Sequence, residues 1–346
     1  MGTTKPAQTR IARYLPGISI LFVSAIVAWM VGTYIPPINE LIISILIGAV
    51  LTNTVGIPEW ALAGIQTHKT WLGTGIVLMG VSLSLDQVVE NGPIILLSVF
   101  SIAILTALLV ELLSRGFFDM SETLGSLLAA GASICGVSAV VAVAGSIDAK
   151  EEDIAYAAAT ILLFDALTIL SYPAIGSLLD LQSQVFGIWA GTTMFSTGPV
   201  VAVGFAHSDV AGQWATITKL TRNALIGLVA IIYATYYTRK RMTSDNKLNS
   251  GPTVHHLSKM WGQFPKFVLG FFILMIISTA GLLSSQSINS IENAYSWLFL
   301  LAFVGLGTEI DVQEFRSAGY HPILVILTSF MIMSVTSLSV LLVVFG

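Results

Sequence analysis

Two stretches of small and hydroxyl-bearing residues interrupt otherwise apolar segments of this chain. The first is Gly131-Ala-Ser-Ile-Cys-Gly-Val-Ser138, and the second is Gly191-Thr-Thr-Met-Phe-Ser-Thr-Gly-Pro199. In hydrocarbon an unpaired backbone N–H or C=O costs several kcal/mol, so an interrupted helix persists only where protein or a water-filled cavity surrounds it. Paired interruptions of this kind are the best sequence indicator of the substrate site of a secondary transporter.

The groups that these breaks expose suit small ions. The N-terminus of a half-helix presents N–H groups and partial positive charge to an anion, whereas freed carbonyls and hydroxyls at a C-terminus suit Na⁺. The alternative is close helix packing, with the hydroxyls bonded to their own backbone. We favour a substrate site. Its predicted residues are Ser133, Cys135, Gly136, Ser138, Thr192, Thr193, Ser196, Thr197, Gly198 and Arg222.

Three charged residues lie deep inside apolar segments, away from the segment ends. Asp165 is predicted to carry the coupling proton or ion, because a carboxylate at mid-bilayer costs at least about 2.5–3.5 kcal/mol; the alternative is an Asp that only fixes helix packing. Arg222 suits bidentate contact with an oxyanion or with Asp165. The alternative for Arg222, and more so for Lys219, is snorkelling to the headgroups. Glu111 and Arg115, four residues apart, are expected to pair near a helix end.

Composition places the chain in a membrane. Of its 346 residues 55% are hydrophobic and 10% are charged, and mean hydropathy is +0.86, against about 25% charged residues in soluble domains. One cysteine excludes an intramolecular disulfide framework, and the scattered basic residues give no support to nucleic-acid binding. Walker, Gly-x-Ser-x-Gly and His-Glu-x-x-His motifs are absent, so we expect no enzyme, cofactor or metal site.

The expected fold is all-α, a polytopic transmembrane bundle of about eleven spans in one transporter domain, 1–346. A cytoplasmic tail (1–16) and a cytoplasmic loop (239–266) flank the helical groups. The apolar segments are roughly 17–35, 38–57, 70–85, 93–113, 122–147, 153–180, 184–206, 211–238, 267–285, 295–310 and 322–345.

Threading these eleven spans from a cytoplasmic N-terminus tests the topology. Twelve of the fifteen Lys and Arg residues then fall inside, Lys150 falls outside, and Lys219 and Arg222 stay within a span. This predicts a multi-pass protein of the cell membrane, in contact with lipid.

Two internal repeats are visible. Residues 130–144 match 190–204 at six of fifteen aligned positions, and Gly80-Val-Ser-Leu-Ser-Leu-Asp86 echoes Gly305-Leu-Gly-Thr-Glu-Ile-Asp311. The opposite expected sidedness of Asp86 and Asp311 favours an inverted repeat. The alternative is convergence on small residues at helix contacts.

Several motifs resemble the YeiH-like family, which is described as sulfate exporters. They are Ala129-Ala-Gly-Ala-Ser-Ile-Cys-Gly-Val-Ser-Ala-Val-Val, Tyr172-Pro-Ala-Ile, Phe186-Gly-Ile-Trp-Ala-Gly-Thr-Thr, Lys219-Leu-Thr-Arg222 and Leu301-Ala-Phe-Val-Gly-Leu-Gly-Thr. The resemblance covers nearly the whole chain. It implies kinship with cation/proton antiporters and anion transporters, which use inverted repeats and crossing broken helices.

The chain departs from that family at three places. The second break has Phe195 and Ser196 where the family tends to have His-Glu, the third span lacks the family's arginines, and Asp165 replaces a glycine. These departures leave Arg222 as the only intramembrane arginine that could hold an anion. From the resemblance we expect a secondary exporter of a small sulfate- or sulfite-like anion, coupled to H⁺ or Na⁺. The alternatives are a Na⁺/H⁺-type antiporter and, less favoured, a channel. A homo-oligomer is compatible with the sequence.

Overall fold

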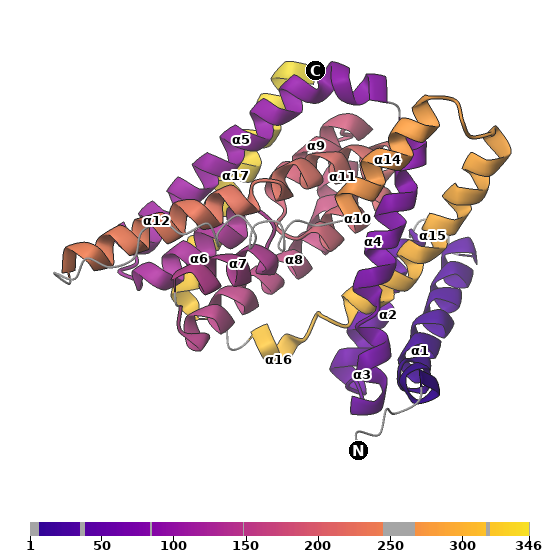
Figure 1. Ribbon diagram of the computed structural model, residues 1–346, viewed down its shortest axis with the longest axis horizontal. Coiled ribbons are helices and arrows are strands. Elements are labelled where there is room, and N and C mark those ends of the chain that lie inside the picture. The colour runs from indigo at the N-terminus through magenta and orange to yellow at the C-terminus, as the bar shows by residue number, and fades with distance from the viewer. Residues whose placement is uncertain are drawn as a thin grey trace. The chain divides into compact units, whose positions relative to one another are not determined.

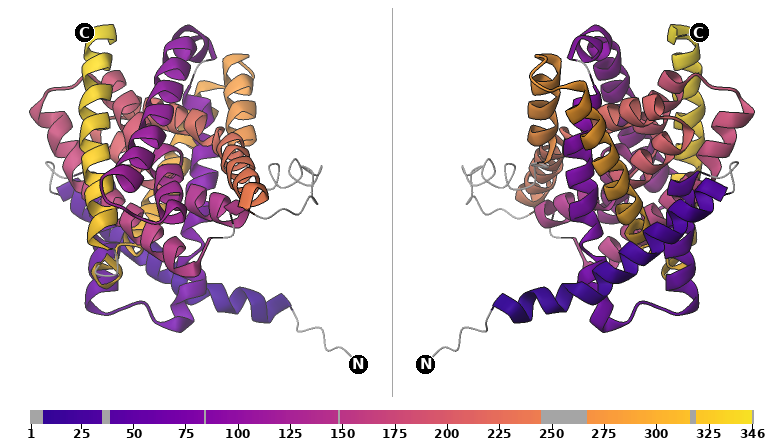
Figure 2. Two further views of the ribbon diagram at one scale, coloured as in Figure 1. Left: turned by 90° about the vertical axis from the view of Figure 1, so that its left-hand side faces the viewer. Right: turned by 90° about the vertical axis from the view of Figure 1, so that its right-hand side faces the viewer.

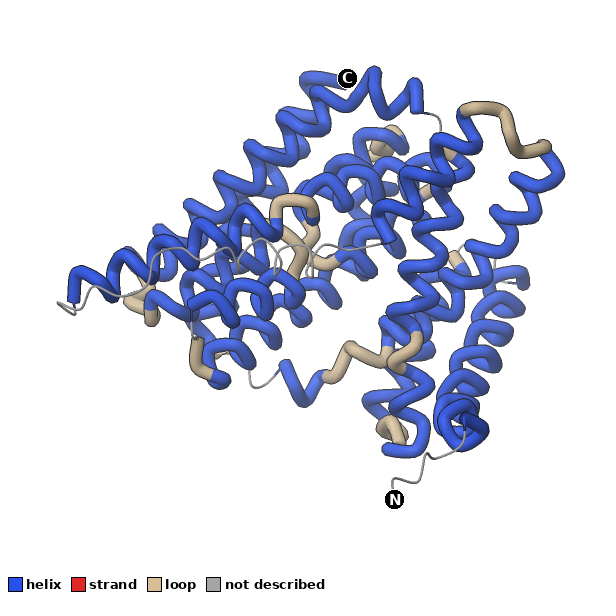
Figure 3. The backbone as a smooth tube through the Cα atoms, viewed as in Figure 1, coloured by secondary structure: helices blue, strands red, loops and turns tan. Residues whose placement is uncertain are grey.

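Every regular element in the described part of the chain is helical. The computed structural model describes residues 7–34, 39–83, 85–147, 149–244, 267–315 and 319–345, and no strand occurs among them (Figure 3). The predicted all-α class is confirmed. Of the predicted tail and loop, 7–16 and 239–244 are helical, while 1–6 and 245–266 lie outside the described residues.

Contacts between residues divide the chain into two units, Met1–Glu90 with Phe267–Val312 and Asn91–Lys266 with Gln313–Gly346. The first unit contains α1 (Ala7–Tyr34), α2 (Glu40–Thr54), α3 (Glu59–Ile65), α4 (His68–Met79), the short helix η1 (Gly80–Ser82), α14 (Phe267–Thr279) and α15 (Ser285–Gly307). The second holds most of α5 (Leu85–Gly116), then α6 (Glu122–Ser133), α7 (Val137–Ile147), α8 (Glu151–Leu178), α9 (Ser183–Thr193), α10 (Thr197–His207), α11 (Asp209–Asn223), α12 (Ile226–Ser244) and α17 (Tyr320–Phe345) (Figure 1). The four-residue α16 (Val312–Phe315) begins at the boundary.

In the first unit, α4 and α15 pack antiparallel. A side chain on Gly305 would collide with His68, one on Gly75 would meet Phe299 at 2.7 Å, and Ser82 Oγ donates to Glu292 Oε1 at 2.9 Å. The two copies of the second repeat, 80–86 and 305–311, thus lie at the C-terminal ends of two helices that run in opposite directions. An inverted repeat requires this arrangement. Ser84 of that repeat lies outside the described residues.

Each of the eleven predicted apolar segments coincides with one helix or one pair of consecutive helices. Five helical stretches among the described residues are long and apolar enough to cross a membrane: Arg13–Tyr34, Gly92–Gly116, Glu151–Leu178, Asp209–Lys240 and Tyr320–Phe345. The last of these is α17, drawn in yellow in Figure 2, which packs along α9.

Segment 122–147 is a re-entrant hairpin rather than a crossing span. Its first helix, α6, begins after Ser121, whose side chain hydrogen-bonds to Asp153 in the first turn of α8. Its second helix, α7, ends only three residues before α8 begins. Between them, a side chain on Gly131 of α6 would meet Val140 of α7 at 2.9 Å. Both ends of hairpin 1 (α6–α7) therefore lie at the N-terminal end of α8.

Segment 184–206 forms hairpin 2 (α9–α10) in the same way. Ser208 Oγ donates to Ser183 Oγ at 2.8 Å, and the rings of Phe186 and His207 stack with centroids 4.1 Å apart. His207 and Phe186 both contact Gly176 near the C-terminal end of α8. Hairpin 2 therefore enters from the end of α8 opposite to hairpin 1.

The two hairpins correct the predicted topology, because neither adds a crossing. Two crossings fewer change the side of the chain twice, so every loop after hairpin 2 keeps its predicted side. The loop containing Lys150 moves to the side of the loop that follows Arg115. The loop between α8 and α9 also changes side, and it contains no Lys or Arg. In the second unit Lys150 then lies on the side of Arg115, which fits the positive-inside rule better than a crossing of segment 122–147 does.

Small residues allow the close packing of hairpin 2. An added Cβ on Gly187 would meet Ala211 O at 2.5 Å, and one on Gly204 would meet Gly212 Cα at 2.9 Å. Thus α9 runs parallel to α11 and α10 runs antiparallel to it. This arrangement positions the two charged residues of α11 beside the tip of the hairpin.

Candidate functional site

The tips of the two hairpins meet inside the second unit. Hairpin 1 turns at Ile134–Gly136, which with the adjoining Ser133 is called tip 1, and hairpin 2 turns at Met194–Ser196, called tip 2. Gly136 has φ +67°, and a side chain there would collide with Ser196 Oγ. Residues 134–136 align with 194–196 in the internal repeat, so equivalent turns of the two repeats are in contact.

Lys219 of α11 joins the two tips. Its ammonium donates to Ile134 O at 2.8 Å and to Met194 O at 3.0 Å, which are equivalent atoms of the repeat. The side chain is completely buried. Snorkelling of Lys219 to the headgroups is therefore wrong: the ammonium is held by carbonyl oxygens that a turn in the chain has freed from helical hydrogen bonds.

Arg222 has a similar role one turn later on α11. Its Nε donates to Ser133 O at 2.6 Å, one terminal nitrogen donates to Met194 O at 2.9 Å, and the other donates to Ala132 O. It is 1% exposed, so snorkelling is wrong here too. Each nitrogen of the guanidinium already satisfies a carbonyl, and direct contact between Arg222 and a substrate anion stays a prediction.

The two cations stabilise the C-terminal ends of α6 and α9. A helix C-terminus carries about half a negative charge on its free carbonyls, and a cation there is stabilising, by up to about 2 kcal/mol where it is partly buried. Here both C-termini point at the same pair of side chains. Lys219 and Arg222 therefore supply the donors that let two broken helices meet in a region without bulk water.

Asp165 lies at the beginning of α10. It projects from the middle of α8, is 3% exposed, and its Oδ1 accepts the backbone N–H of Ser196 at 3.1 Å. A carboxylate at a helix N-terminus is stabilised by the exposed N–H groups. The structure thus places the predicted coupling residue against tip 2; its role in coupling stays a prediction.

The predicted hydroxyls separate into two groups. At the C-terminal ends of α6 and α9, just before each break, Ser133 Oγ donates to Ala130 O at 3.4 Å and Thr193 Oγ1 donates to Trp189 O at 2.5 Å. Thr192 Oγ1 bonds its own helix and Ser337 Oγ of α17 at 2.9 Å. These three hydroxyls are buried and bonded within the protein, as the packing alternative expects.

The hydroxyls that follow the breaks are more accessible. Ser138, in the first turn of α7, is exposed, and Ser196 and Thr197 at the start of α10 are partly exposed. They lie where α7 and α10 present their N-terminal N–H groups. Gly198 is buried in the same turn of α10, and Cys135 at tip 1 is 8% exposed.

Two residues belong to this region although the sequence did not identify them. The amide nitrogen of Asn223 donates to Thr197 Oγ1 at 2.9 Å, and its buried Oδ1 has no hydrogen-bond partner among the described residues. Tyr172 OH lies 2.8 Å from Thr193 Oγ1 and its ring stacks on Trp189 with centroids 4.0 Å apart. Two signals were available: both are polar residues in apolar segments, and Tyr172 begins one of the motifs that carry the family resemblance.

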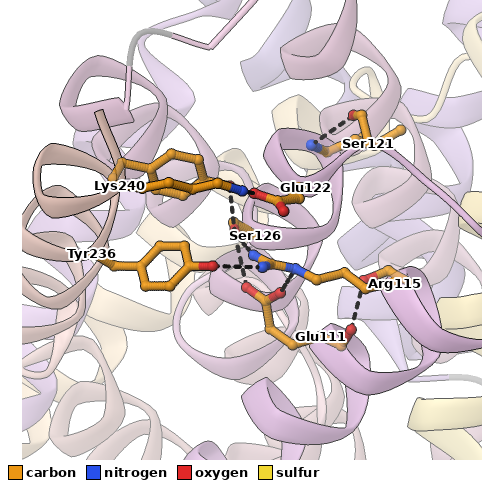
Figure 4. A network of polar contacts seen from close by, with 10 residues as sticks. Glu111, Arg115, Ser121, Glu122, Ser126, Tyr236 and Lys240 are labelled. Atoms are coloured by element: carbon orange, nitrogen blue, oxygen red, sulfur yellow. Dashed lines mark hydrogen bonds and ion pairs between the residues drawn. The ribbon is translucent and has the colours of Figure 1, made fainter. Parts of the chain in front are cut away.

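A separate polar network fixes the base of hairpin 1. Glu111 and Arg115 of α5 form the predicted ion pair at 2.6 Å, and Ser126 of α6 donates to Glu111 Oε1 at 2.8 Å. Arg115 also donates to Tyr236 of α12 at 3.1 Å, and Lys240 pairs with Glu122 (Figure 4). The network joins α5, α6 and α12.

Among the described residues, no three His, Cys, Asp or Glu side chains gather as a metal site.

Residues 16–326 match the family model "Conserved hypothetical protein 698". The chain is 33% identical over 321 residues to a UPF0324 membrane protein of Nitratidesulfovibrio vulgaris, covering 89% of this chain and 87% of that one. It is 30% identical over 341 residues to one of Clostridium tetani, covering 93% and 97%. No solved structure matches. The chain therefore belongs to this family of helical membrane proteins.

Proposed function

We propose that this protein is a secondary transporter, not an enzyme, and that its substrate binds where the two hairpin tips meet. The observation that carries the proposal is the contact of Gly136 with Ser196, bridged by Lys219. Two interrupted helices meeting within a membrane unit form the irregular backbone on which secondary transporters build substrate sites.

A small oxyanion of the sulfate or sulfite kind is the proposed substrate. Two cationic side chains and one carboxylate surround the tips, which leaves an excess of positive charge. The N-termini of α7 and α10 add N–H donors, and Ser138, Ser196 and Thr197 add hydroxyls. The resemblance to sulfate exporters supports the same class. We propose that Arg222 and Lys219 act through charge, and that Ser138 and Thr197 contact the anion.

Coupling to H⁺ or Na⁺ through Asp165 would make the transport active, because the chain has no nucleotide-binding motif. Alternating access would come from movement of one helical bundle against the other, as in other secondary transporters. The position of Asp165 also favours a second candidate function, Na⁺/H⁺-type antiport without an anion, because a buried carboxylate beside freed backbone groups is a feature of cation sites as well.

Transient currents on a solid-supported membrane separate the candidates. The purified protein, reconstituted in liposomes, receives jumps of sulfite, sulfate or a small sulfonate, with and without Na⁺ and pH gradients. The proposal predicts a saturable, decaying current for one anion that weakens in Ser138→Ala. Current on Na⁺ or pH jumps alone, indifferent to every anion and lost in Asp165→Asn, would establish the antiporter instead. A sustained, non-saturating current would indicate a channel.

A further inference from the structure

An apolar groove of about 740 Å³ lies between α5 and α12 in the second unit. One face of α5 (from Phe100 to Gly116) and one face of α12 (from Leu225 to Tyr236) form its walls. Ser133 and Ile134 of tip 1 lie at its inner end. Its volume lies within the range of about 300–1,000 Å³ that is usual for ligand sites.

The α12 wall of the groove has the length of one bilayer leaflet, and the α5 wall is somewhat longer. Residues 225–236 number twelve, and they span about 16 Å of helix at 1.5 Å per residue. Half of the hydrocarbon core is about 15 Å. The inner end lies at the hairpin tips, beside the middle of α8. The walls between the two ends are aliphatic and include the exposed side chains Leu108 and Leu228.

The outer end of the groove is polar. Glu111, Arg115, Tyr233 and Tyr236 line it, and Arg115 is paired with Glu111 at 2.6 Å. Arg239 follows Tyr236 by three residues on the same face of α12 and adds one further positive charge. Tyrosine and basic residues at this depth are typical of the membrane interface, where they meet headgroups. An apolar channel that runs about one leaflet along α12 and ends in tyrosine hydroxyls and a net positive charge matches an acyl chain attached to a phosphate.

We infer that this groove is a binding site for one phospholipid, with an acyl chain between α5 and α12 and its phosphate at the end marked by Arg115 and Arg239. The methyl end of the acyl chain then reaches Ser133 and Ile134. The carbonyl oxygens of these two residues accept hydrogen bonds from Arg222 and Lys219. The lipid packs behind tip 1. This inference does not depend on which substrate the protein transports, because it concerns a different surface of hairpin 1.

Native mass spectrometry of the purified full chain in a neutral detergent tests the site. The probes are phosphatidylglycerol, phosphatidylethanolamine and diacylglycerol with the same acyl chains, titrated onto delipidated protein. We expect one retained phospholipid per chain and about tenfold weaker retention of diacylglycerol, equivalent to about 1.4 kcal/mol. Equal retention of all three lipids would overturn the phosphate contact.

Variants locate the lipid. Ala107→Phe fills the groove from α5 and Leu228→Trp fills it from α12; either variant that stays folded, judged by gel filtration, should lose the retained lipid. Ser101→Phe is the control, on an exposed residue of α5 that does not line the groove. Unchanged retention in the folded variants overturns the site. Loss of a dimer instead of a lipid would make the groove an interface between two copies and would also overturn it.

Discussion

The α-carbon of Gly136 faces the hydroxyl of Ser196, and this contact joins the tips of two hairpins that enter the protein from opposite ends of α8. The chain at Gly136 has a positive φ of +67°, which a residue with a Cβ adopts only at a cost of about 1–2 kcal/mol. Two independent features therefore require glycine at this position: the positive φ of the backbone and the lack of space for a side chain beside Ser196.

Gly136→Ala should abolish transport while leaving membrane insertion intact. The added methyl group both strains the turn and pushes Ser196 away. The measurement is initial transport rate in liposomes containing equal amounts of wild type and variant. Gly145→Ala on α7 is the control, because its Cβ would meet nothing within 4 Å. If the single variants Gly136→Leu and Gly198→Leu both transported at the normal rate, a substrate site at the tips would be refuted.

Lys219→Met should destabilise the protein without any substrate present. The change leaves the buried carbonyl of Ile134 without its ammonium donor, and an unsatisfied buried acceptor costs about 1–3 kcal/mol. Thermal unfolding in detergent measures the effect as a lower midpoint. Lys150→Met, on an exposed residue before α8, should leave the midpoint unchanged. An unaltered midpoint in Lys219→Met would mean that Lys219 does not support the tips.

Asp165→Asn should change the ion dependence of transport rather than the fold. Asparagine keeps an oxygen that accepts the N–H of Ser196, but it has no charge and binds no proton in this pH range. The expected result is a transport rate that no longer varies with pH or Na⁺. If rate and pH dependence both match the wild type, Asp165 serves packing only.

Ser138→Ala and Thr192→Val should separate a substrate contact from a structural one. Ser138 is exposed in the first turn of α7, so its loss should raise KM, by about tenfold if one hydrogen bond worth about 1.4 kcal/mol disappears. Thr192 bonds Ser337 across α9 and α17, so its loss should lower the unfolding midpoint with KM unchanged. The opposite pattern would place the anion at the C-terminal ends of α6 and α9, before the breaks.

Cys135 offers a native probe of hairpin opening, because it is the only cysteine of the chain and lies almost buried at tip 1. Thiol reactivity follows exposure, so a maleimide should label Cys135 much more slowly than it labels the cysteine introduced by Ser138→Cys in a Cys135→Ser background. Saturating substrate should then slow the labelling of that introduced cysteine. Labelling of both positions at one rate, indifferent to substrate, would contradict the proposed placement of the anion.

The sequence by itself determined that the chain is an all-helical membrane protein, where its apolar segments lie, and where two of them are interrupted. Those conclusions follow from local properties, because hydropathy and helix-breaking residues act along the chain within one segment. The alignment of 130–144 with 190–204 also identified the two turns that meet, since equivalent residues in a repeat occupy equivalent turns.

Only the tertiary structure decided that the two interrupted segments turn back instead of crossing, and which polar groups satisfy one another. An apolar segment of about 25 residues fits a crossing helix or two antiparallel half-helices equally well. The difference lies in contacts such as Ser183 with Ser208, which are distant in sequence. The roles of Lys219 and Arg222 were beyond sequence reasoning for the same reason: a buried cation needs acceptors, and here the acceptors are main-chain carbonyls, which no residue type reveals.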